Sequence, residues 1–170
     1  MTRDPAWREA PIVVAGNNQR RRINIDAAKR LAQEHAQPLV LWSLDPVTNL
    51  GSVNTRDLFK RLAEGPDKRY DLVGCFVKGA PAVLGTNTNT AMGLVNGAHI
   101  KLHGLYITDP RDVDTVESAS PGQAVWLQNP PAAVLYTVPG TAPGKWPDAA
   151  SLGKTPTGEP ILAMIHKGHT

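Results

Sequence analysis

The sequence has little cysteine, few aromatic residues and no long apolar run. Its one cysteine, Cys75, leaves no second cysteine for an internal disulfide. No stretch approaches the roughly 20 apolar residues that a membrane-spanning helix needs, and the N-terminal residues lack the apolar core of a secretory signal. We therefore expect an intracellular protein, nuclear or cytoplasmic, that has no membrane partner.

Complete catalytic and metal-binding motifs are also missing. The segment Gly153-Lys154-Thr155 resembles the end of a phosphate-binding loop, but that loop needs a glycine where this sequence has Asp148. No Gly-x-Ser-x-Gly motif marks a nucleophile, and His99 and His103 have no cysteine or carboxylate at ligand spacing. We predict no catalytic residue and no metal site in this chain, and no cofactor bound by this chain alone.

The composition permits a packed interior. The chain has 170 residues, of which 41% are hydrophobic, so it can form one core of ordinary size. Its net charge of +3 is unevenly distributed, because residues 1–70 hold 12 Lys and Arg against 8 Asp and Glu, whereas residues 71–170 hold 6 against 7. An acidic partner is therefore expected at the first part of the chain.

The first part has the pattern of an α/β unit. Residues 11–15 form a short β-branched run that predicts a strand, and Asn17 or Asn18 can cap a following helix. Apolar residues recur at helical spacing from Ile23 to Ala32, and residues 38–42 predict a second strand. Strand, helix and strand in this order are typical of a parallel sheet.

The pattern of apolar and turn-forming residues changes after residue 95. A short helix beginning at Asn54 or Thr55 and strands at 71–77 and 80–84 complete the α/β region. Beyond it, apolar runs at 100–107, 124–127 and 133–138 alternate with turn residues, which favours a small antiparallel β structure. Residues 139–160 contain five prolines and four glycines and predict an irregular segment.

Three segments together resemble the second RecA-like lobe of Pif-type DNA helicases, which are relatives of RecD. Residues 79–97 are similar to the family's G-x-P-V-M-L-x-x-N…G-L-x-N-G segment, and 93–97 read Gly-Leu-Val-Asn-Gly. Residues 10–24 are similar to its strand that leads into a helix containing Ile-Asn. Residues 130–135, Pro-Pro-Ala-Ala-Val-Leu, are similar to its P-P-x-x-V-L-V strand.

The resemblance implies a partial RecA-like parallel sheet with helices at 1–95, an SH3-like β segment at 96–138 and a Pro/Gly-rich tail at 139–170. ATP and Mg²⁺ are implied for the intact family, but the phosphate loop of the first lobe is absent here. The chain therefore resembles a fragment or degenerate copy that, without the missing first lobe, should not hydrolyse ATP.

The expected partner is single-stranded DNA. The residues expected to contact it lie after the first strand, where helix amides and guanidinium groups can meet a phosphate, and after the strand at 80–84: Asn17, Asn18, Arg20, Arg22, Thr86 and Asn87. A solvated helix face and ordinary loop hydrogen bonds would explain the same residues without a ligand. A different function, a non-catalytic protein- or peptide-binding module, would use Trp126, Tyr136 and Trp146 as exposed aromatic residues.

Overall fold

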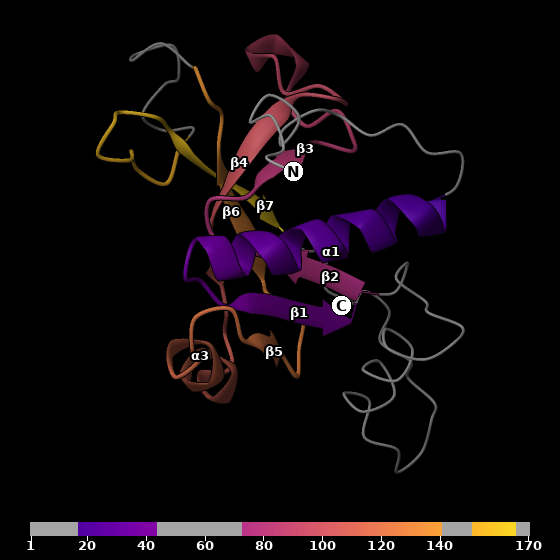
Figure 1. Cartoon of the computed structure of the whole chain (residues 1–170). Helices are drawn as coiled ribbons and strands as arrows, with labels where there is room; N and C mark the ends of the chain where they lie inside the picture. Colours follow the sequence, from indigo (N-terminus) through magenta and orange to yellow (C-terminus); the bar gives the residue numbers. More distant parts are fainter. Residues whose placement is uncertain (1–16, 44–72, 141–150, 166–170) are drawn as a thin grey trace, which may run out of the picture.

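The computed structural model describes residues 17–43, 73–140 and 151–165, which form a mixed α/β fold with two sheets (Figure 1). Sheet A has the strand order β2-β1-β5, with β1 Leu39–Ser43, β2 Val73–Phe76 and β5 Ala124–Trp126. Sheet B has the order β3-β4-β6-β7, with β3 Pro81–Val83, β4 His99–Tyr106, β6 Ala133–Thr137 and β7 Ile161–Ile165. The described helices are α1 (Asn17–Glu34), the 3₁₀ helix η3 (Thr90–Met92) and α3 (Pro110–Glu117).

Most of the expected elements within these ranges are present. The helix predicted after residue 17 is α1, and the strands predicted between 38 and 138 correspond to β1 through β6. Three elements are not among the predicted ones, namely η3, α3 and β7, and β7 lies within the tail expected to be irregular. The strand expected at 11–15 and the helix expected from Asn54 or Thr55 lie outside the described residues.

Sheet A differs from the parallel sheet that the sequence predicts. β1 pairs in parallel with β5, with Leu39 opposite Ala124, but it pairs antiparallel with β2, with Leu41 opposite Cys75. A RecA-like parallel sheet is therefore not confirmed. Strands from both sides of the expected boundary at residue 95 also pair with one another. β3, before the boundary, lies next to β4 in sheet B, and β5, after it, lies next to β1 in sheet A.

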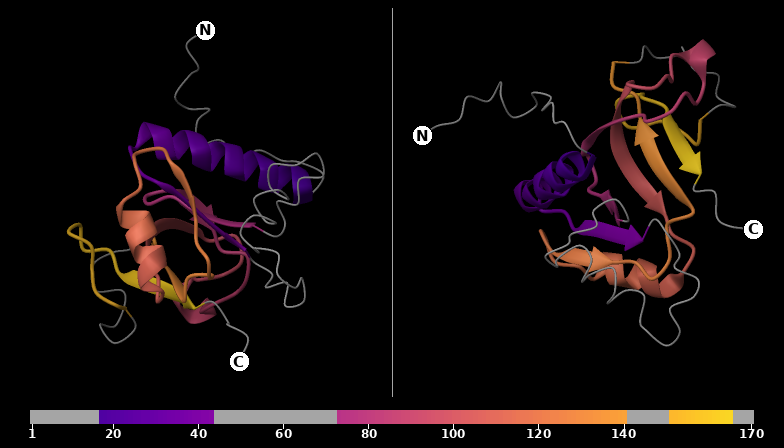
Figure 2. Two further views of the ribbon diagram at one scale, coloured as in Figure 1. Left: turned by 90° about the horizontal axis from the view of Figure 1, so that it is seen from below. Right: turned by 90° about the vertical axis from the view of Figure 1, so that its right-hand side faces the viewer.

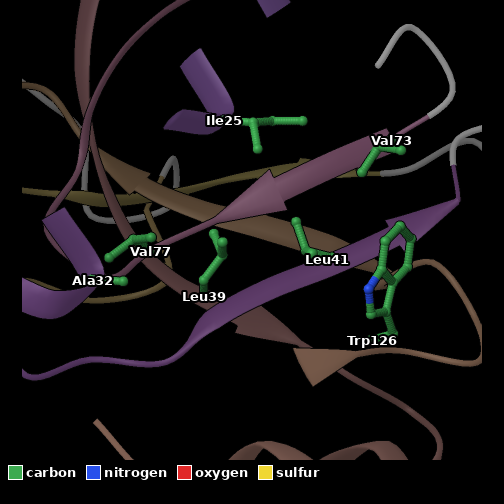
Figure 3. Packing of buried hydrophobic residues seen from close by; sticks show 7 residues of the cluster. All are labelled: Ile25, Ala32, Leu39, Leu41, Val73, Val77 and Trp126. Atoms are coloured by element: carbon green, nitrogen blue, oxygen red, sulfur yellow. The ribbon is translucent and has the colours of Figure 1, made fainter. Parts of the chain in front are cut away.

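The helix α1 covers one face of sheet A, and sheet B and α3 lie on its other side (Figure 2). Ile25 and Ala32 of α1 are seven residues apart and thus share one face of the helix, where they pack on Leu39 and Leu41 (Figure 3). Side chains at alternate positions of β1 point to the opposite face, where Val40 packs among residues of sheet B and α3. Sheet A is consequently buried on both faces.

The last turn of α1 closes with a Schellman motif that has alanine where glycine is usual. The Gln37 N–H donates to the Ala32 carbonyl at 2.9 Å, and the Ala36 N–H donates to the Gln33 carbonyl at 3.3 Å. Ala36 has φ of 52°, a left-handed conformation that costs a residue with a Cβ roughly 1–2 kcal/mol.

We expect Ala36→Gly to raise the free energy of unfolding by about 0.5–1 kcal/mol, because glycine removes this steric cost but has a more flexible unfolded state. Urea denaturation measures the change. Ala27→Gly, at an exposed position inside α1, is the control and should lower stability by about 1 kcal/mol. Equal losses in both variants would contradict the role given to Ala36.

Candidate nucleic-acid interface

The predicted basic residues of α1 do not form one patch. Arg20 and Arg22 are both exposed, but two residues correspond to about 200° of rotation around a helix, so their side chains leave opposite sides. Arg22 shares its side with the exposed Lys29, seven residues further on. Asn17 and Asn18, one of which the sequence predicts as the cap before the helix, are the first two residues of α1; their side chains are outside the described part.

Thr86 and Asn87 lie in the loop between β3 and β4, at the end of sheet B away from α1 (Figures 1 and 2). Both residues are exposed. The Asn87 Oδ1 accepts a hydrogen bond from the Asn96 N–H at 2.8 Å, so this side chain ties the two ends of the loop together. Asn87 therefore has a structural role in the loop, and the structure does not bring it together with the arginines of α1.

The Gly-Leu-Val-Asn-Gly segment is explained by the same loop. Gly93 ends η3 with φ of 79°, a left-handed conformation that favours glycine. Leu94 is buried and packs with Leu84 and Ile100. Asn96 and Gly97 form the expected tight turn, in which the Ala98 N–H donates to the Val95 carbonyl at 3.0 Å.

A group of basic side chains that the sequence did not predict lies around Gly79. A Cβ added to Gly79 would lie 3.9 Å from the His35 Nδ1 and 3.9 Å from the Lys101 Cε. Lys78 precedes this glycine, and Lys78, His35 and Lys101 are all exposed. We call His35, Lys78 and Lys101 the Gly79 cluster. Its members come from the turn that follows α1, the turn after β2 and the strand β4.

The fold, and no local motif, brings these residues together. The Gly79 N–H donates to the Leu102 carbonyl at 2.8 Å, and the Leu102 N–H donates to the Ala80 carbonyl at 2.9 Å. These bonds hold the turn after β2 against β4, next to the residue that follows α1. The Lys78-Gly79 turn is visible in the sequence, but its proximity to His35 and Lys101 depends on long-range pairing.

The geometry suits an anion. Two lysines supply compact charges and His35 a ring that can donate a hydrogen bond, while Gly79 has no side chain to keep a ligand from the backbone. Such a surface can bind phosphate groups without reading a sequence of bases. Arg20 lies fifteen residues before His35, about 22 Å along the helix, and is not part of this group.

Other candidate chemistry in the described residues is limited. Cys75 is part of β2, and burial raises the pKa of its thiol, which makes the thiolate nucleophile scarce at neutral pH. No group of three or more His, Cys, Asp or Glu in the described ranges could hold a metal ion. Within the same ranges, no helix has the length and apolar character needed to span a bilayer.

The segment Gly153-Lys154-Thr155 does not fit ATP. Lys154 forms an isolated β-bridge with Pro160, and the Thr155 Oγ1 accepts a hydrogen bond from the Glu159 N–H at 3.1 Å. No helix follows this tight turn, whereas a phosphate loop leads into a helix whose N-terminal amides hold the phosphates.

Comparison with known proteins finds no matching family model, no similar curated protein and no similar solved structure. The resemblance to Pif-type helicases therefore stays a prediction.

Proposed function

We propose that the chain is a non-hydrolysing derivative of the second lobe of a Pif-type helicase that binds single-stranded DNA through the phosphates. In this proposal, α1 and the strands β1, β2 and β3 derive from the RecA-like lobe, and the strands β4, β5 and β6 derive from the SH3-like insertion. The observation that carries the DNA-binding proposal is the Gly79 cluster, where the His35 ring and the Lys101 side chain lie close to Gly79 and Lys78 is the exposed residue that precedes this glycine. Gly79 also begins the segment that resembles the helicase motif.

The proposal predicts that Lys78→Ala/Lys101→Ala weakens binding of a single strand about 10-fold at low salt, because two phosphate contacts are lost. The dependence of the logarithm of the binding constant on the logarithm of salt concentration should become shallower by about 1.4, which corresponds to two contacts at roughly 0.7 each. Fluorescence anisotropy of a labelled oligonucleotide, titrated at several salt concentrations, measures both changes.

The matched control is Arg30→Ala/Arg111→Ala, which removes the same charge from exposed positions of α1 and α3. This control should bind nearly as tightly as the unaltered protein. An equal loss in both variants would mean that net charge alone determines binding. The Arg20→Ala/Arg22→Ala variant tests the arginines expected from the sequence, and a large loss there would move the interface to α1.

A peptide-binding module is the second candidate. Trp126 and Tyr136 are buried, so they do not form an exposed aromatic groove, and Trp146 lies outside the described residues. The edge strand β7 favours this candidate instead, because its end carries the exposed apolar side chains of Met164 and Ile165 and edge strands can accept an added strand. Binding that is insensitive to salt and is lost in Ile165→Lys would support a peptide partner.

A further inference from the structure

A pocket lies beside the Gly79 cluster, between β4, α3 and sheet A. Its volume is about 340 Å³, near the lower end of the roughly 300–1,000 Å³ that small-molecule sites occupy. The walls are mainly apolar, and the side chains that form them include Pro38, Val40, Phe76, Ile107, Val113 and Val116. Val40 and Phe76 belong to sheet A, whereas Val113 and Val116 belong to α3, so the pocket has apolar walls on two sides.

One side of the pocket is the open edge of β4. β3 pairs with His99 to Lys101, and among the described residues no strand pairs with the second half of β4 on that side. The Tyr106 carbonyl accepts from the Ala132 N–H at 2.8 Å, toward β6. Because successive residues of a strand direct their main-chain groups to opposite sides, the N–H and C=O of Leu105 are directed away from β6, and Leu105 is one of the residues that line the pocket.

The polar groups of the pocket include both donors and acceptors. Lys78 and His103 line it together with Glu117 and the half-buried Gln37. His103 is placed there by a β-bulge, since the pairing of β4 with β6 shifts between Leu102 and Gly104. Without this bulge, alternation along the strand would place the side chains of His103 and His99 on the same face of β4.

These features match a nucleobase. A base has two flat apolar faces and an edge that carries both hydrogen-bond donors and acceptors. The main chain of Leu105 likewise offers one donor, its N–H, and one acceptor, its C=O. The Glu117 carboxylate can accept a hydrogen bond from an exocyclic amino group, and the Gln37 amide can both donate and accept. An aliphatic side chain of a peptide would fill the walls but leave these polar groups without partners.

Lys78 connects the pocket to the Gly79 turn, since it lines the pocket and directly precedes Gly79 in the chain. We propose that one amino-bearing base of the bound strand, such as adenine, turns out of the strand and enters this pocket while its flanking phosphates lie on the Gly79 cluster. The inference rests on the proposed function, because the strand must first bind through its phosphates.

The test compares two strands of equal length and charge: one that is entirely abasic, and one that carries a single adenine at its centre. The strand with the base should bind on the order of 10-fold more tightly, which is within the range for one base held by a protein. Val113→Phe fills the pocket and should remove this difference while leaving the affinity for the abasic strand unchanged, which also shows that the variant is folded. Val113→Ala should keep the difference.

The outcomes separate the two proposals. Equal, salt-dependent binding of both strands by the unaltered protein would overturn the base pocket and leave the phosphate interface intact. Failure to bind either strand would overturn both. A difference that persists in Val113→Phe would place the base elsewhere. Competition by free deoxyadenosine monophosphate, if lost in Val113→Phe and seen without any strand preference, would assign the pocket to a free nucleotide and overturn the inference as stated.

Discussion

Replacing Gly74 with alanine should lower the free energy of unfolding by about 3 kcal/mol, because the new methyl group would occupy the same space as a buried indole ring. Gly74 lies directly opposite Trp42 in the antiparallel pair of β1 and β2. The Cβ of an alanine would overlap the Trp42 ring atoms, among them Cε2 and Nε1. Both residues are buried, so the ring has little room to move away.

The position of Trp42 depends on packing. Within the described part of the chain, its Nε1 is buried and has no hydrogen-bond partner. The indole lies over the glycine, among Phe76, Val125 and Leu127. A ring that is held only by its neighbours must shift when one of them grows, and the shift would disturb the packing of sheet A against sheet B.

Thermal or urea denaturation measures the effect, and Gly85→Ala provides the matched control. A Cβ at Gly85 would have no heavy atom within 4 Å, so this substitution should change stability by less than about 0.5 kcal/mol. Trp42→Leu should partly restore the stability lost in Gly74→Ala, since the smaller leucine side chain leaves room for the alanine methyl group. Additive losses in the double variant would show that the two residues do not interact as the structure indicates.

The second large effect is expected at Asp112, a carboxylate buried inside α3 with 1% of its surface exposed. Its Oδ1 accepts from the Gln128 N–H at 2.9 Å, and its Oδ2 accepts from the Asn129 N–H at 3.2 Å. Asp112→Ala should lower the free energy of unfolding by about 2–4 kcal/mol, because two main-chain donors in a partly buried loop lose their acceptor.

Two further variants define the cause. Asp112→Asn keeps one acceptor oxygen and should lose about half as much stability as Asp112→Ala. Asp114→Ala, at an exposed position of the same helix, should change stability by less than about 0.5 kcal/mol. A loss at Asp114 as large as at Asp112 would indicate that α3 responds to any substitution and would contradict the specific role of the buried carboxylate.

The sequence predicts the elements that have a local signal. The apolar spacing from Ile23 to Ala32 predicts α1, and β-branched or aromatic runs predict most strands. The helix α3 also has a local signal: Asp109 caps it, accepting from the Arg111 N–H at 3.0 Å, and Pro110 occupies its first turn. β7 was missed because the Pro- and Gly-rich residues before it dominate the composition of that segment.

Pairing between distant strands has no comparable signal. Nothing in residues 39–43 indicates that β1 lies between an antiparallel and a parallel neighbour. The Gly79 cluster and the pocket both depend on these pairings, so neither could be derived from spacing along the chain. Local patterns predict Arg20, Arg22, Thr86 and Asn87, but the fold directs the two arginines to opposite sides of α1 and places the other two residues in the loop between β3 and β4.

The interleaving of the two sheets has a consequence for how the chain acquires its structure. Sheet A is not complete until β5 arrives, and β5 follows β3 and β4 of the other sheet. Contacts such as Leu39 with Ala124 join residues far apart in the chain, and contacts of this kind slow folding because a long loop must close first. During synthesis, the edge of β1 that pairs with β5 therefore stays unpaired until most of the chain has left the ribosome. A cut after residue 95 would leave β1 without β5 and β3 without β4, so the two pieces should recover structure only when mixed.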